Sequence, residues 1–280
     1  MVTKWHKRGA DPEALKALHP GVPSWMRRQL LDWAHAVSLS RVYDAYGRLN
    51  PDATLMEEYE TAVRRPSTLV GLFERDGAKG LYEAMEEDEF LDFVDFLVYR
   101  TGLEDGGDGA LQALEGVLSE GGSEWRVGTR GDFASLEKRV PEGVVDAAEN
   151  AMSNSGDAGS LLAEAWHAAF GKSPDTEEAY EKAIKAVEEA GAHIVTPNNA
   201  RATLGTMIRD MKAQKDWKLD LPSPDADVPV KMAEALWIGQ ESRHGGNGYR
   251  KPTQVEAEAA VLLAVSLVQW FASGALARRP

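Results

Sequence analysis

The side chains best suited to chemistry lie together in one glycine-rich stretch, residues 242–251 (SRHGGNGYRK). A histidine beside an arginine can act as a general acid or base on a phosphate ester while the guanidinium holds the phosphate, and neither role needs a metal ion. The backbone amides of a glycine-rich turn can add hydrogen bonds to an anion. The stretch therefore predicts an anion site with two candidate catalytic residues, Arg243 and His244, and three candidate ligand-binding residues, Asn247, Arg250 and Lys251.

The same residues allow a plainer interpretation. Cations in the last turn of a helix bind its free carbonyl groups, and glycine residues commonly end a helix. On this hypothesis Arg243 and His244 close a helix, and the glycine residues that follow them terminate it. The pattern of residue types alone leaves both interpretations open.

The loop must be positioned by the helices on either side of it. Apolar residues at helical spacing predict a helix over 230–240, and Pro252 is suited to the first turn of another helix, which contains the apolar run 257–271. Upstream, the same spacing predicts helices over 161–170, 175–190 and 198–211. Because short connections favour antiparallel neighbours, we expect a bundle of about five helices with the loop between the last two.

The first half of the chain predicts a second helical domain. Apolar residues recur at helical spacing over 24–46, 54–64, 67–74, 77–85 and 89–99, whereas alternation at 123–127 and 136–140 predicts at most a short β-hairpin. The small and polar residues of 152–159 leave little to pack, which is typical of a domain linker. We therefore expect a mainly α protein with a loosely ordered lead-in at 1–22, a helical domain at 23–152 and a helical bundle at 157–280.

Charge and composition limit the partners. Asp and Glu number 45 against 31 Lys and Arg, a formal net charge of −14, so general affinity for DNA or RNA is not expected and any RNA contact must use a local basic patch. The apolar run 257–271 is shorter than the roughly 18 residues of a membrane span. Residues 1–8 are basic but lead into no apolar segment, so they are not a secretory signal. We expect a cytoplasmic protein with no membrane partner.

No motif for a metal or cofactor is expected. The chain has no Cys, and its six His residues lack the spacing of metal ligands. The sequence Gly171-Lys172-Ser173 is similar to the end of a phosphate-binding loop, but Trp166 stands where that loop needs its first Gly. The prediction is no cofactor and no metal site.

The second half also carries short motifs in a definite order: Ala165-Trp166, Ala179-Tyr180, Ala183-Ile184-Lys185-Ala186-Val187-Glu188, Thr203-Leu204-Gly205-Thr206 and Arg243-His244-Gly245. This series, over residues 157–275, resembles the abortive-infection protein C-terminal family. That family is grouped with the HEPN domains (higher eukaryotes and prokaryotes nucleotide-binding). The resemblance implies a HEPN-like helical bundle of the kind found in phage-defence, toxin and RNA-processing proteins.

The resemblance also implies a site and an assembly. Active HEPN ribonucleases carry an Arg, usually followed by a polar residue, and a His a few positions downstream; they need no metal, and two copies face each other in a homodimer. Arg243 matches the Arg and His244 matches the polar residue, but Gly248, Tyr249 and Arg250 stand where the downstream His is expected.

Two functions follow from this departure. One is a phage-defence ribonuclease in which Arg243 binds phosphate and His244 takes over the acid or base role from a shifted position. The other is a non-catalytic module that binds a nucleotide, RNA or a protein partner as a regulator or antitoxin-like component.

Overall fold

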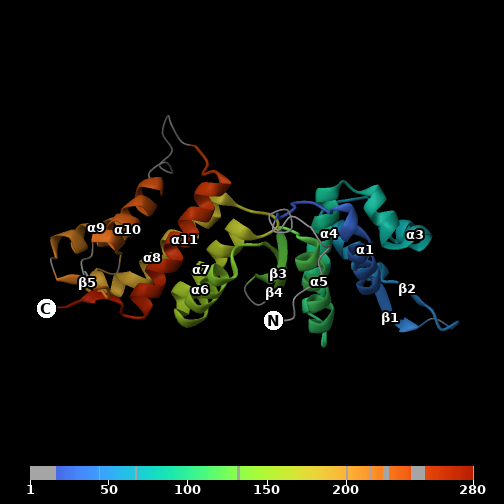
Figure 1. Ribbon diagram of the computed structural model, residues 1–280, viewed down its shortest axis with the longest axis horizontal. Helices are drawn as coiled ribbons and strands as arrows, with labels where there is room; N and C mark the ends of the chain where they lie inside the picture. The colour runs from blue at the N-terminus through green and yellow to red at the C-terminus, as the bar shows by residue number, and fades with distance from the viewer. Residues whose placement is uncertain are drawn as a thin grey trace, which may run out of the picture. The chain divides into compact units, whose positions relative to one another are not determined.

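The computed structural model describes residues 17–43, 45–66, 68–130, 133–199, 201–214, 216–222, 227–240 and 250–279. Its contacts divide the chain into two compact units, Met1–Arg139 and Val140–Pro280. Figure 1 shows that helices dominate both units and that the strands form only short antiparallel pairs. The prediction of a mainly α protein is confirmed.

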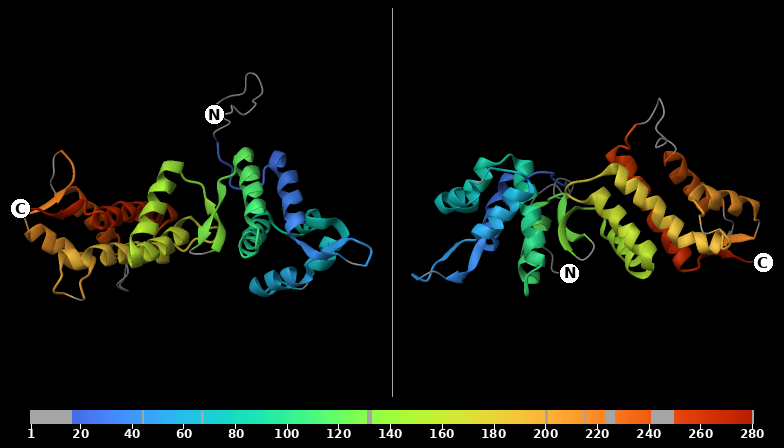
Figure 2. Two further views of the ribbon diagram at one scale, coloured as in Figure 1. Left: turned by 90° about the horizontal axis from the view of Figure 1, so that it is seen from below. Right: turned by 180° about the vertical axis from the view of Figure 1, so that it is seen from behind.

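The first unit alternates helices with two short hairpins (Figures 1 and 2). In chain order its elements are α1 (Ser24–Val37), β1 (Leu39–Tyr43), β2 (Leu49–Pro51), α2 (Ala53–Ala62), α3 (Leu69–Ala84), α4 (Glu87–Gly102), α5 (Asp108–Gly121), β3 (Trp125–Arg130) and β4 (Phe133–Lys138). Its core is aromatic: Phe90 and Phe93 of α4 are fully buried, and the ring of Tyr59 meets that of Phe93 edge-on at 4.9 Å.

The end of the expected lead-in is attached to this unit. The His19 amide donates to the Gly122 carbonyl at 2.9 Å, the Glu124 amide donates to the His19 carbonyl at 2.9 Å, and Val22 is buried. At least residues 17–22 therefore belong to the packed structure.

A glycine divides α3. Gly77 has φ +60 inside the helix, a left-handed value that an L side chain adopts at a cost. The sequence predicted separate helices ending at residue 74 and starting at 77, and the break falls between two helical halves as this pattern indicates. Residues from the second half of α3 and from α1 line one cavity.

The second unit is a helical bundle closed by one small sheet. Its elements are α6 (Glu142–Asn154), α7 (Gly156–Phe170), α8 (Thr176–Val195), α9 (Leu204–Ala213), β5 (Trp217–Leu219), α10 (Asp227–Gln240), α11 (Gln254–Ala272) and β6 (Leu276–Arg278). Small residues let the central helices approach closely. A Cβ at Gly191 of α8 would lie 2.5 Å from Cε of Met207 and 2.9 Å from Cε2 of Phe271, so a larger residue would require these side chains to shift.

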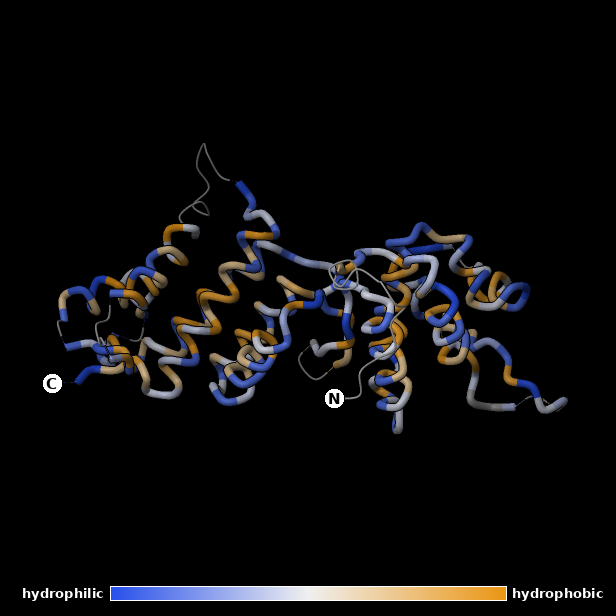
Figure 3. The backbone as a smooth tube through the Cα atoms, in the orientation of Figure 1, coloured by the Kyte–Doolittle hydropathy of each residue, from blue (hydrophilic) through white to orange (hydrophobic). Residues whose placement is uncertain are grey.

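Helix α11 forms much of this core. Figure 3 shows hydrophobic residues along most of its length, and Ala257, Val261, Ala264 and Val268 are fully buried. By length and composition it is also the one described helix that could cross a membrane. Its packing against α7 and α8 accounts for the apolar sequence without a bilayer.

The division between the units differs from the expected one. The contacts place it between Arg139 and Val140, and α6, expected in the first domain, packs on α7 and α11. The segment 152–159, predicted as a linker, is a tight corner: a Cβ at Gly159 would lie 2.0 Å from the Met152 carbonyl oxygen. The small residues of this segment allow two helices to pack closely, whereas a linker would have no packed neighbours.

Two strand pairs were not expected. The β3–β4 hairpin lies where the sequence predicted it, but β1 also pairs with β2, and β5 pairs with β6. The last pair joins segments far apart in the chain and is reinforced by an ion pair between Arg278 and Asp216 at 2.6 Å. Such three-residue strands are specified by tertiary contacts more than by local pattern.

We predict that Glu60 is a main determinant of the first unit's stability. Its buried Oε1 accepts hydrogen bonds from the backbone amides of Thr68 at 2.6 Å and Leu69 at 2.7 Å, at the start of α3. Glu60→Ala leaves both donors without this acceptor and should lower the free energy of unfolding by about 2 kcal/mol. Urea denaturation followed by circular dichroism measures the change.

The matched control is Glu57→Ala, which removes an exposed carboxylate from the same helix. It should change stability by less than about 0.5 kcal/mol. Equal effects of the two substitutions would contradict the role assigned to Glu60.

Candidate functional site

Three of the five predicted site residues, Arg243, His244 and Asn247, lie outside the residues that the structure describes. Arg250 and Lys251, the other two, are described, as are the helices on either side. Helix α10 ends at Gln240 and α11 begins at Gln254. The prediction that the stretch connects the last two helices of the bundle is confirmed.

A cavity of ≈ 360 Å³ lies where these two helix ends meet α8. Both sides of the 241–249 segment contribute to it: Ile238 and Gly239 precede the segment, and Arg250 and Pro252 follow it. The remaining lining residues come from α8 and α11: Tyr180, Glu256, Ala259, Ala260 and Leu263. Apart from one cation, one carboxylate and one phenol, the lining is apolar.

Gly239 lets α10 approach the phenol of Tyr180. A Cβ at this position would lie 1.8 Å from the Tyr180 hydroxyl oxygen, a distance that no side chain tolerates. The side chain of Tyr180 is only 8% exposed. Its hydroxyl group lies against the backbone of α10 at Gly239, and both residues line the cavity. Glycine at 239 therefore sets the width of the cavity at this end.

A capping box fixes the start of α11. The Thr253 hydroxyl accepts from the Glu256 amide at 3.3 Å, and the Glu256 carboxylate accepts from the Thr253 amide at 2.9 Å. The two bonds satisfy amides that a helix start leaves without partners. They also hold the Glu256 carboxylate at the rim of the cavity.

Arg250 is bound by that carboxylate. Its two terminal nitrogens donate to the two oxygens of Glu256, one at 2.6 Å, in a bidentate pair. The Arg250 guanidinium and the Thr253 amide together lower the pKa of Glu256 to about 2. The positive charge of Arg250 is therefore compensated inside the chain.

Lys251 lies beside carboxylates of α8. Its Nζ is 3.9 Å from Oδ1 of Asp175 and 3.6 Å from Oε2 of Glu177. Asp175 is the N-cap of α8, and hydrogen bonds from the Glu178 and Glu177 amides, with a smaller effect of Lys251, lower the pKa of its carboxyl group. Both described cations of the predicted site thus face carboxylates, which weakens the prediction that they bind an anionic ligand.

Sequence reasoning did not identify Tyr180, Gly239 or Glu256 as neighbours of the site. Only Glu256 had a local signal, since Thr253-x-x-Glu256 is the pattern of a capping box. Among the described residues, no group of three or more His, Asp and Glu side chains is arranged to hold a metal ion.

Comparison of the chain with protein-family models, with curated proteins and with solved structures finds no match.

We predict that Glu256→Gln destabilises the protein in a pH-dependent way. A carboxylate whose pKa is depressed on folding contributes stability above its unfolded pKa of about 4.3, and this contribution is lost as the pH falls through the folded pKa. The melting temperature of the variant should therefore be lower than that of the wild type at neutral pH. The gap should close as the pH falls from about 4 toward 2. Thermal unfolding over this pH series measures it.

Glu189→Gln, on an exposed position of α8, is the control. If the difference in melting temperature between Glu256→Gln and the wild type stays constant down to acid pH, the ion pair and the cap are not its cause.

Proposed function

We propose that the second unit is a HEPN-like module of a phage-defence protein, which binds RNA at the mouth of the α8–α10–α11 cavity and cleaves it without a metal ion. Arg243 holds the scissile phosphate. His244 removes the proton from the ribose 2′-hydroxyl, whose oxygen attacks the adjacent phosphorus and displaces the 5′-oxygen, and the 5′-oxygen takes its proton from water. The products are a 2′,3′-cyclic phosphate and a 5′-hydroxyl end.

The observation that supports this location is that residues on both sides of the 241–249 segment line one cavity. Arg243 is four residues beyond Gly239, and a fully extended chain spans at most about 3.6 Å per residue, so the Arg243 Cα must be within roughly 14 Å of that of Gly239. His244 follows directly.

Binding without cleavage is the second candidate function, and two observations favour it. Arg250 is paired with Glu256, and Lys251 faces Asp175 and Glu177, so neither cation is ready to neutralise a transition state. The His expected downstream of Arg243 is absent. On this alternative the cavity holds a nucleotide, an RNA end or a protein segment, and Arg243 serves only as a ligand.

We predict that pure wild-type protein cleaves single-stranded RNA in EDTA and leaves 2′,3′-cyclic phosphate ends. Arg243→Ala and His244→Ala should each lower the rate at least about 100-fold, because general acid–base catalysis contributes about 10²–10⁴-fold. Arg243→Ala should also weaken RNA binding, whereas His244→Ala should leave it nearly unchanged. Gel assays of end-labelled RNA and fluorescence anisotropy provide the two measurements.

Arg209→Ala is the matched control, because Arg209 is an exposed arginine of the same unit that is paired with Asp210. RNA binding that depends on Arg243 without any cleavage would establish the second candidate function. An absence of both RNA binding and RNA cleavage would exclude the ribonuclease and the RNA-binding form of the second candidate.

A homodimer through the second unit accompanies this proposal. Val255, Ala259 and Leu262 are exposed on one face of α11, and Val255 is 73% exposed. Ile238 of α10, 63% exposed, lines the same cavity as Ala259, so the apolar patch continues to the cavity mouth. A second copy that covers this patch would bring its own 241–249 segment close to the first.

We predict that the wild type is a dimer in solution and that Val255→Glu with Leu262→Glu makes it a monomer, because the dimer would have to bury both new charges. Light scattering coupled to gel filtration measures the mass. Leu103→Glu, at an exposed apolar position of the first unit, should leave the dimer intact. A monomeric wild type, or a dimer that survives the double substitution, would exclude this interface.

A further inference from the structure

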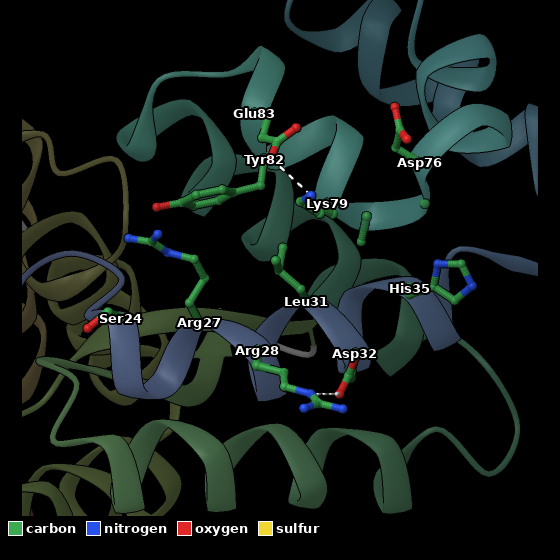
Figure 4. Close-up of a pocket in the computed structure, with 12 residues that line it drawn as sticks. Ser24, Arg27, Arg28, Leu31, Asp32, His35, Asp76, Lys79, Tyr82 and Glu83 are labelled. Atoms are coloured by element: carbon green, nitrogen blue, oxygen red, sulfur yellow. Dashed lines mark ion pairs between the residues drawn. The ribbon is translucent and has the colours of Figure 1, made fainter.

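A cavity of the first unit lies between α1 and the second half of α3 (Figure 4). Its volume of ≈ 630 Å³ is that of a small-molecule site, since such sites usually measure about 300–1,000 Å³. The kink at Gly77 shapes one end. A Cβ there would lie 2.6 Å from Nδ1 of His35, so glycine both breaks α3 and lets α3 pass the imidazole.

Most charges around the cavity cancel in pairs, two of which are drawn in Figure 4. Arg28 pairs with Asp32 at 3.8 Å, and Lys79 pairs with Glu83 at 3.4 Å. Asp76 is paired with Arg75, a neighbour outside the lining, at 2.7 Å. The rims are therefore close to neutral, although they carry three carboxylates that would repel a polyanion.

Arg27 is the exception. Its guanidinium lies over the ring of Tyr82, 4.9 Å from the ring centroid, and forms no ion pair with any carboxylate in the described part of the chain. Its Nε is buried and has no hydrogen-bond partner there. Arg27 lines the cavity, and its half-buried guanidinium has no carboxylate beside it among the described residues, so it provides a position for one negative charge.

The opposite end of the cavity carries His35. Its ring stacks on Phe73 at 4.8 Å with an interplanar angle of 13°, and it makes no hydrogen bond with the described residues. His35 is two helical turns beyond Arg27, about 12 Å along α1, with the apolar Leu31 between them. Along α1 the cavity therefore presents a cation, an apolar surface and an imidazole in succession.

We propose that this cavity binds a small organic monoanion with a planar, apolar body. The acid group, a carboxylate, sulfonate or phosphodiester, pairs with Arg27, and the body lies over Leu31 toward the stacked ring of His35. The neutral rims favour one charge over many, which distinguishes this ligand from RNA. The site is confined to the first unit and does not depend on the RNA chemistry proposed for the second.

The test uses two probes with the same ring system. Anilinonaphthalene sulfonate carries one negative charge, and N-phenylnaphthylamine is its uncharged counterpart; both fluoresce when they leave water for an apolar site. The full-length chain should bind the sulfonate at one site, at least about tenfold more tightly than the uncharged probe, because a charge-assisted hydrogen bond adds that much. Fluorescence titration gives the affinities, and isothermal titration calorimetry gives the stoichiometry.

The variants test separately the charge of Arg27 and the volume of the cavity. Arg27→Gln should remove the preference for the sulfonate, Arg27→Lys should restore most of it, and Leu31→Trp should weaken both probes by filling the cavity. Arg209→Gln removes the same charge from the second unit and should change nothing. Circular dichroism and melting temperature confirm that each variant is folded, since unfolded protein binds these dyes without specificity.

Equal affinity for the two probes, or a preference that survives Arg27→Gln in a folded protein, would overturn the proposal. So would a sulfonate affinity that is unchanged by Leu31→Trp, because the dye would then bind elsewhere.

Discussion

Carboxylates that accept backbone hydrogen bonds from a different element recur throughout both units. A helix start or a hairpin strand exposes amide groups that need acceptors, and here a neighbouring helix supplies them. The pairs are Glu60 with Thr68 and Leu69, Asp95 with Leu136, Glu115 with Val127, and Glu188 with Leu204. Part of the acidic excess of this chain is therefore structural. The same interaction has a cost at Glu188: desolvation by burial raises the pKa of its carboxyl group, which disfavours the ionised form that accepts the hydrogen bond.

At the candidate site, one carboxylate both caps a helix and pairs with a cation. Glu256 accepts from the Thr253 amide and binds Arg250 with the same carboxylate. A phosphate that recruited Arg250 would have to displace Glu256 from the guanidinium, while the capping bond to Thr253 could remain. Breaking the ion pair between Arg250 and Glu256 therefore costs free energy, and this cost would weaken the binding of any anion that uses Arg250. The start of α11 and the charge at the cavity mouth are controlled by one side chain.

Local patterns predicted the elements that have strong local causes. The helix start at residue 175 and the break near Gly77 follow from residue types at short spacing. Pro252 was predicted in the first turn of the last helix, but α11 begins just after it, with Thr253 as the N-cap. The corner at 152–159 was not predicted, because small residues favour either a linker or a close helix crossing, and only the packed partner decides between them. The pairing of Lys251 with Asp175 also escaped prediction, since its two residues are distant in the chain. Sequence therefore predicted that residues 241–249 connect the last two helices, but not the carboxylates that face Arg250 and Lys251.

The compensated cations bear on which RNA chemistry this site could support. Each phosphate neutralised by a protein cation adds to affinity through the release of counterions, so a protein that grips a strand needs several unpaired cations. With Arg250 and Lys251 facing carboxylates, and with a net charge of −14, the proposed function relies on Arg243 to hold phosphate. Such a site is suited to positioning one phosphate beside His244, as cleavage or nucleotide binding requires. In the proposed dimer, a second copy across the apolar face of α11 would double the number of such positions without adding a basic surface.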